Sequence, residues 1–180
     1  LTASGALADD AVNTLAYAAS RVGKKLSKKA GEVLSAGDIA AINAYTQESP
    51  LYQQLNANLR KRDRSQLVPF FPYLKLLFTA LMKLPTVTGT VYRGVKLDLS
   101  ASYEEDEDAV WWGFSSTTDS IKVLQSEQFM GKHGTRTMFN IELNGYSAVN
   151  IQRYSAVQSE SEILILPGIR LTIECKLDQG

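Results

Sequence analysis

The first half of the chain carries apolar residues at helical spacing. A stripe that recurs every three or four positions over residues 7–22 predicts an amphipathic helix. Ser35 followed by Asp38 is a capping-box pattern and predicts the start of a second helix. The Ser-Pro pair at 49–50 is typical of a helix N-terminus, and a further apolar stripe covers residues 70–81. We therefore expect four helices before Pro85.

After Pro85 the spacing of apolar residues shortens to every second position. Phe139, Ile141 and Leu143 alternate with polar residues, as expected of a strand with one buried face. Helices followed by many short strands favour an α+β fold over a parallel βαβ sheet. The acidic run 104–108 is most simply a solvated loop between strands. The predicted strands cover residues 90–95, 110–115, 137–143, 148–151, 162–166 and 169–175.

Composition and charge remove several classes of protein. Of the 180 residues, 44% are hydrophobic and 21% charged, which is ordinary for one globular domain. The formal net charge is zero, so the basic footprint of a nucleic-acid-binding protein is missing. One Cys (Cys175) and one His (His133) can build neither an internal disulfide nor a zinc site.

The chain also lacks the segments and motifs of several other classes. No apolar run reaches the roughly 20 residues of a membrane span, and no signal peptide opens the chain. Neither a Rossmann G-x-G-x-x-G nor a phosphate-binding G-x-x-x-x-G-K-[ST] loop is present. We therefore expect no nucleic-acid or membrane partner, and any nucleotide must bind in another way.

The first candidate for chemistry is Arg93, in the sequence Val-Tyr-Arg-Gly-Val. Strand alternation places Arg93 on the same face as Val91 and Val95, where a guanidinium needs a partner. That partner is either a structural carboxylate or the phosphate of a ligand, and both remain open. Gly94 lets a ligand approach the backbone closely.

A run of four hydroxyl side chains, residues 115–118, is the second candidate. It lies at the end of the predicted tryptophan-rich strand 110–115. Such a run can be a strand end that bonds its own backbone, or part of a site. No His or Lys lies nearby in sequence, so a nucleophilic serine has no visible base.

Two glutamates, Glu160 and Glu162, form the third candidate at the start of an apolar strand. On a strand, positions i and i+2 share a face, so the two carboxylates would repel each other and raise the pKa of one. The alternative is a frayed, solvated strand start. Paired carboxylates suit chemistry at an anomeric carbon, where they stabilise an oxocarbenium ion. With an arginine for phosphate, a phosphorylated N-riboside such as NAD is one candidate substrate.

In this order, the three motifs resemble the R-S-E class of mono-ADP-ribosyltransferases. The resemblance extends to the helical segments 44–46 and 55–60, which look like those of arginine-specific members, and it covers roughly residues 35–176. It implies two packed, mainly antiparallel sheets flanked by helices, with NAD in the cleft between the sheets. It also implies one catalytic domain over residues 1–180, with 1–34 as an N-terminal helical extension.

The resemblance assigns NAD-binding roles to the first two motifs. Arg93 would bind the phosphate and ribose region of NAD, and Gly94 would offer backbone contacts to the nicotinamide amide. Ser116 would brace the catalytic glutamate, with Thr117 and Thr118 completing the Ser-Thr-Ser motif. Thr118 replaces the more usual serine but keeps the hydroxyl.

The third motif and its neighbours carry the remaining implied roles. Glu162 would stabilise the oxocarbenium ion, and Glu160 would select arginine as the acceptor. The turn 153–159 resembles the family's substrate-recognition loop, with Tyr154 as its aromatic candidate. Phe129 is a candidate to stack on the nicotinamide ring, or else a core residue.

The expected function is transfer of ADP-ribose from NAD, as co-substrate, to an accessible arginine of a target protein, without a metal ion. An NAD glycohydrolase using the same site, or a non-catalytic module that binds NAD or a partner, is the alternative. Because a single Cys cannot form the disulfides of family members on vertebrate cell surfaces, an intracellular enzyme, a translocated bacterial effector or toxin domain, or an invertebrate member is favoured.

Overall fold

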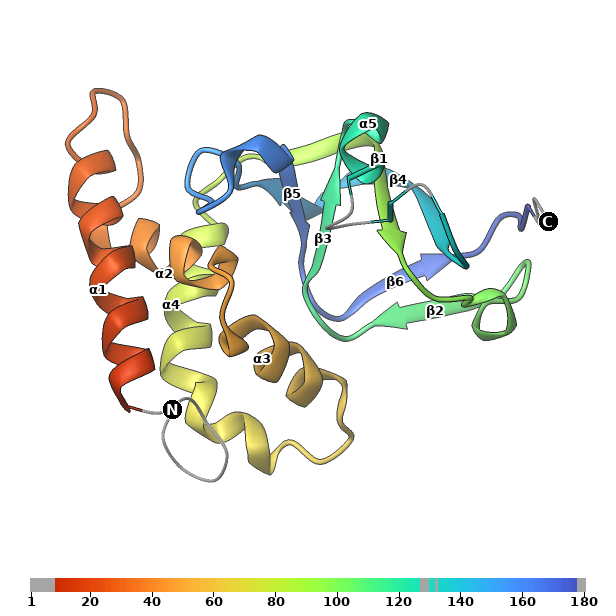
Figure 1. Ribbon diagram of the computed structural model, residues 1–180, viewed down its shortest axis with the longest axis horizontal. Coiled ribbons are helices and arrows are strands. Elements are labelled where there is room, and N and C mark those ends of the chain that lie inside the picture. Colours follow the sequence, from red (N-terminus) through yellow and green to blue (C-terminus); the bar gives the residue numbers. More distant parts are fainter. Residues whose placement is uncertain (1–8, 127–129, 132, 178–180) are drawn as a thin grey trace. The chain divides into compact units, whose positions relative to one another are not determined.

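A computed structural model describes residues 9–126, 130–131 and 133–177 (Figure 1). The chain forms two compact units. The helical unit contains the described residues up to Pro85 together with Val149–Ser159, and the strand unit contains Thr86–Ala148 and the described residues from Glu160 onward. Helices precede strands along the chain, so the α+β class expected from the sequence is confirmed.

The second and third helices of the helical unit begin where the capping signals predict. Ser35 is the N-cap of the second helix: its hydroxyl accepts from the Asp38 amide, and the Asp38 carboxylate accepts from the Ser35 amide. Ser49 caps the third helix, with Pro50 in its first turn. Among the described residues, no helix is long and apolar enough to cross a membrane. The elements are α1 (Asp9–Leu26), α2 (Ala36–Thr46), α3 (Pro50–Arg60), the 3-10 helix η1 (Ser65–Phe70) and α4 (Phe71–Leu81).

Helix α1 approaches the start of α2 closely at Gly23. A Cβ at position 23 would lie 2.2 Å from the carbonyl oxygen of Ala36, and this atom belongs to backbone that cannot rotate away. We therefore expect Gly23→Ala to lower the free energy of unfolding by about 1–3 kcal/mol, as overpacking does. Urea denaturation measures this change.

Gly37 provides the matched control, because it also lies in a helix but in open space. The nearest atom to a Cβ there is Ser35 Oγ, at 3.8 Å. Gly37→Ala should leave stability unchanged or raise it by up to about 1 kcal/mol, since alanine restricts the unfolded chain. A Gly23→Ala protein as stable as Gly37→Ala would show that α1 and α2 do not meet as described.

The strand unit contains two sets of strands. The larger set closes on itself in the order β1-β3-β5-β4, and β2 pairs with β6 in a separate two-stranded sheet. The pairs β1–β3, β3–β5 and β2–β6 are antiparallel. The strands are β1 (Thr86–Val95), β2 (Asp108–Trp111), β3 (Ser115–Thr118), β4 (Thr137–Asn150, whose end enters the helical unit), β5 (Glu162–Ile165) and β6 (Ile169–Thr172); the short helices are η2 (Ser100–Ser102), α5 (Ile121–Leu124) and η3 (Gln158–Glu160).

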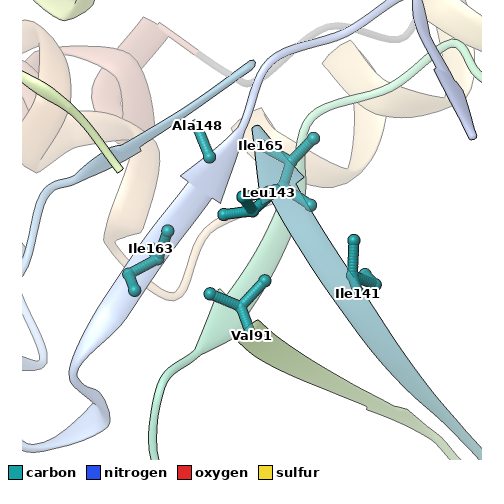
Figure 2. Close-up of a cluster of buried hydrophobic side chains, with 6 residues drawn as sticks. All are labelled: Val91, Ile141, Leu143, Ala148, Ile163 and Ile165. Atoms are coloured by element: carbon teal, nitrogen blue, oxygen red, sulfur yellow. The ribbon is translucent and has the colours of Figure 1, made fainter. Parts of the chain in front are cut away.

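An apolar cluster inside the closed set holds the strand unit together. Figure 2 shows its six buried side chains converging from β1, β4 and β5. Trp111, Phe139, Ile169 and Leu171 pack against this cluster, so the residues of the two-stranded sheet share the same core. The cluster consists of Val91, Ile141, Leu143, Ala148, Ile163 and Ile165.

Three of the predicted strands were wrongly divided. The predicted strand 110–115 is two strands, β2 and β3, which lie in different sheets and are separated by a bend at Gly113. The hydroxyl run therefore forms a strand of its own and does not end the tryptophan strand. Conversely, the predicted strands 137–143 and 148–151 are one strand, β4, which continues through Gly145 at φ +95°.

Candidate active site

The pairing of β3 with β5 brings the hydroxyl run and Glu162 together. In the antiparallel register, Ser116 lies opposite Leu164 and Thr118 lies opposite Glu162. Residues two apart on a strand share a face, so these four side chains lie on one face of the pair. Ile163 belongs to the apolar cluster, so this face points away from that cluster, although Leu164 on it is itself fully buried.

The Glu162 carboxylate is buried and held by a hydroxyl. Only 6% of Glu162 is exposed, and Ser116 Oγ donates a hydrogen bond of 2.5 Å to Glu162 Oε1. Hydrogen bonds to a charged acceptor are short and fix orientation. The expected bracing contact between Ser116 and the glutamate is thus present in the structure.

The guanidinium of Arg93 is positioned from two sides. Its Nη1 donates to the carbonyl oxygen of Ser116 at 2.8 Å, and its Cζ lies 5.9 Å from the centre of the Trp111 ring. Trp111 is itself fixed, because its Nε1 donates to the Tyr103 hydroxyl at 2.9 Å and its ring packs edge-to-face on Phe139. Cation–π contacts of this kind orient an arginine.

Trp111 is a site residue that the sequence analysis missed. Its only sequence signal was its place in an apolar strand, which is also the signal of an ordinary core residue. Trp111 lies at the end of β2, beside Arg93 of β1. The sequence positions of the two residues do not predict this contact.

Gly94 follows Arg93 and is covered by another side chain. A Cβ at position 94 would lie 2.7 Å from Met130 Cβ, so only glycine fits at this distance. The group that approaches the Gly94 backbone in the structure is this methionine, and the contact expected between Gly94 and nicotinamide stays a prediction.

Thr117 lies on the opposite face of β3 from Ser116. It is 5% exposed, and its Oγ1 donates to the carbonyl oxygen of Ile163 at 2.7 Å. The Thr117 hydroxyl therefore braces β3 against β5, and the NAD contact expected of Thr117 stays a prediction.

The two glutamates do not share a strand face, and this prediction was wrong. Glu160 ends η3, the strand starts only at Glu162, and Ser161 between them has φ +48°. That left-handed conformation costs a non-glycine residue about 1 kcal/mol and breaks the alternation of a strand. Glu160 is partly buried, and this burial raises the pKa of its carboxyl above the ordinary value of 4.5.

The two remaining candidate site residues are the aromatic residues Phe129 and Tyr154. Phe129 lies outside the described residues. Tyr154, the aromatic candidate of the substrate-recognition loop, is 5% exposed, and its hydroxyl donates to Glu32 Oε1 at 2.8 Å. Its side chain is therefore part of the helical unit, and its role in substrate recognition stays a prediction. In the described part of the chain, no three His, Cys, Asp or Glu side chains are close enough to hold a metal ion.

Comparison with known families gives a match over most of the chain. Residues 7–170 match the family described as NAD:arginine ADP-ribosyltransferase. A curated relative, the NAD(+)–arginine ADP-ribosyltransferase Vis of Vibrio splendidus (strain 12B01), described as putative, is 31% identical over 134 residues. These residues are 68% of this chain and 53% of the relative, so the chain spans about half the length of Vis.

Solved structures of two proteins have the same fold. Vis in complex with agmatine superposes with a TM-score of 0.65 at 23% identity, covering 98% of this chain and 83% of that one. A variant of the eukaryotic mono-ADP-ribosyltransferase ART2.2 in complex with NAD gives a TM-score of 0.66 at 24% identity, covering 89% of this chain and 70% of that one. With the family match extending over residues 7–170, the chain belongs to the NAD:arginine ADP-ribosyltransferase family.

Proposed function

We propose that this chain transfers ADP-ribose from NAD to an arginine side chain of a target protein and releases nicotinamide. The observation that carries the proposal is the connection from Arg93 through Ser116 to Glu162. It links one cation on β1 to one buried carboxylate on β5 through β3, the strand that pairs with both. NAD requires this pair of charges, because its pyrophosphate is anionic and its ribose becomes cationic as nicotinamide leaves.

Glu162 supplies the electrostatic part of the reaction. The bond between ribose C1′ and the nicotinamide nitrogen breaks, its electron pair leaves with neutral nicotinamide, and positive charge develops on the ribose. A fixed carboxylate stabilises this oxocarbenium ion more than it stabilises bound NAD, which is the condition for faster chemistry. Ser116 holds the carboxylate in place, and Arg93 binds the pyrophosphate.

Glu160 presents the acceptor. A guanidinium nitrogen attacks C1′ and must lose one proton as the new C–N bond forms. A carboxylate can hold the cationic guanidinium and accept that proton, and its raised pKa makes it a better proton acceptor than an ordinary glutamate. We propose that residues 1–180 act as one catalytic domain with NAD as co-substrate.

The test is nicotinamide release from NAD, measured with and without agmatine as a small guanidine acceptor. Agmatine is chosen because Vis has been crystallised with it. We expect release to rise with agmatine and mass spectrometry to detect ADP-ribosyl-agmatine. Release that is indifferent to agmatine would indicate a glycohydrolase, and NAD binding without any release would indicate a binding module.

A further inference from the structure

Glu32 is a buried carboxylate in the connection between α1 and α2. Its side chain is 1% exposed, and both of its oxygens have partners. Oε1 accepts from the Leu34 amide at 3.0 Å and from the Tyr154 hydroxyl at 2.8 Å. Oε2 lies 3.0 Å from Nη2 of Arg153 in an ion pair. Glu32 thus joins the first helical segments to residues more than a hundred positions further along the chain.

These partners keep Glu32 ionised in spite of its burial. Burial by itself raises the pKa of a carboxyl, but the hydrogen bonds from Leu34 and Tyr154 and the charge of Arg153 hold the pKa of Glu32 below its ordinary value. A buried charge is costly without such partners, so loss of the carboxylate releases them together.

The turn that contains Arg153 and Tyr154 is fastened at two further points. Asn43 Nδ2 on α2 donates to the carbonyl oxygen of Tyr154 at 2.9 Å, and the Ala156 amide donates to Thr46 Oγ1 at 2.8 Å. Glu32 is the only one of these anchors, among the described residues, that supplies a full charge. The turn is therefore held to the helical unit by one ion pair and several hydrogen bonds.

The anchored turn leads directly into Glu160. Gln158 Nε2 donates to the carbonyl oxygen of Arg153 at 3.2 Å, and Gln158 begins the short helix η3 that ends at Glu160. Arg153 and the acceptor glutamate are therefore joined by a short segment that carries a hydrogen bond of its own. Reacting groups need to be placed to within a fraction of an ångström for transfer to be efficient.

We propose that Glu32 is a positioning residue for arginine transfer: its carboxylate anchors Arg153 and Tyr154 and so fixes the turn that leads into Glu160. This inference rests on the proposed function. Cleavage of NAD depends on Arg93, Ser116 and Glu162, all in the strand unit, whereas Glu32 and the turn belong to the helical unit. Loss of Glu32 should therefore affect the acceptor step more than cleavage of NAD.

Glu32→Gln and Glu32→Ala test this directly. Glutamine keeps the size and one acceptor oxygen but removes the ion pair with Arg153, and alanine removes every contact of the carboxylate. We expect the ratio of ADP-ribosyl-agmatine formation to NAD hydrolysis to fall about tenfold in Glu32→Gln and further in Glu32→Ala, as expected for a misplaced acceptor. Hydrogen exchange at the Ala156 and Val157 amides, which both donate hydrogen bonds, should become faster.

Controls separate the possible outcomes. Glu48→Gln removes an exposed glutamate from the same unit and should leave the ratio and the exchange unchanged. If the alanine variant does not fold, Tyr154→Phe removes only the hydroxyl bond and should lower the ratio in the same direction. An unchanged ratio in folded Glu32→Gln and Tyr154→Phe, with wild-type transfer intact, overturns the role of Glu32. Absence of transfer in the wild type overturns the proposed function itself.

Discussion

Replacement of Glu162 by glutamine is expected to lower nicotinamide release from NAD by about a thousandfold or more, because the charge that faces the oxocarbenium ion disappears. Glutamine has nearly the same shape and still offers an oxygen to Ser116 Oγ, which donates to Glu162 in the wild type. The folded structure should therefore survive. Steady-state nicotinamide release, with thermal unfolding alongside, measures both effects.

Two further variants make the interpretation of Glu162→Gln specific. Ser116→Ala leaves the carboxylate in place but removes this hydrogen bond, so release should fall by only about ten- to a hundredfold. Glu174→Gln removes an exposed glutamate of the strand unit and should leave release unchanged. If Glu162→Gln retained more than about a tenth of the wild-type rate, the carboxylate would not be supplying the electrostatic stabilisation proposed for it.

The helices could be predicted from the sequence because their signals are local. Ser35 with Asp38 and Ser49 with Pro50 mark helix starts within four residues, and both starts are confirmed. The alternation of apolar and polar residues that predicts β6 is also a local signal, and burial alternates along Ile169–Thr172 as this pattern predicts. Strand boundaries were less certain because a run such as 110–115 stays apolar across a bend, and pairing decides where each strand ends.

The candidate site could be predicted only where its residues follow a recognisable order. Arg93, Ser116 and Glu162 were selected from that order, and the structure connects them. The positions of Trp111 and Glu32 could not be predicted, because each acts through a contact with a residue distant in sequence. A tryptophan in an apolar strand is typical of a core residue, and a glutamate after a helix is typical of a solvent-exposed residue, so neither residue type indicates a functional role.

The relative placement of Glu160 and Glu162 also could not be predicted from local sequence patterns. The strand pattern extended naturally from Ile165 back to Glu160, and nothing about a serine at position 161 indicates a positive φ. A glycine or asparagine there would have signalled a turn. The positive φ at Ser161 separates Glu160 in η3 from Glu162 in β5, so the two carboxylates are held by different elements.

This separation leads to the prediction for Glu160. We expect Glu160→Gln to lower the ratio of ADP-ribosyl-agmatine formation to NAD hydrolysis by about a hundredfold, because the neutral amide neither holds a cationic guanidinium nor accepts its proton. NAD cleavage should fall much less, since Glu162, Ser116 and Arg93 are unchanged. Agmatine product and free ADP-ribose, quantified in the same reaction, give the ratio directly.

The pH dependence of the same ratio identifies the carboxyl responsible. Burial raises the pKa of Glu160 above 4.5, so on acidification its carboxylate is protonated at a higher pH than that of an ordinary glutamate. Transfer should therefore decline relative to hydrolysis as pH falls through that raised value, and recover as pH rises above it. In Glu160→Gln the ratio should be low and no longer depend on pH in this range. A wild-type ratio that stayed constant down to pH 4.5, or equal loss of both activities in Glu160→Gln, would mean that Glu160 does not serve the acceptor.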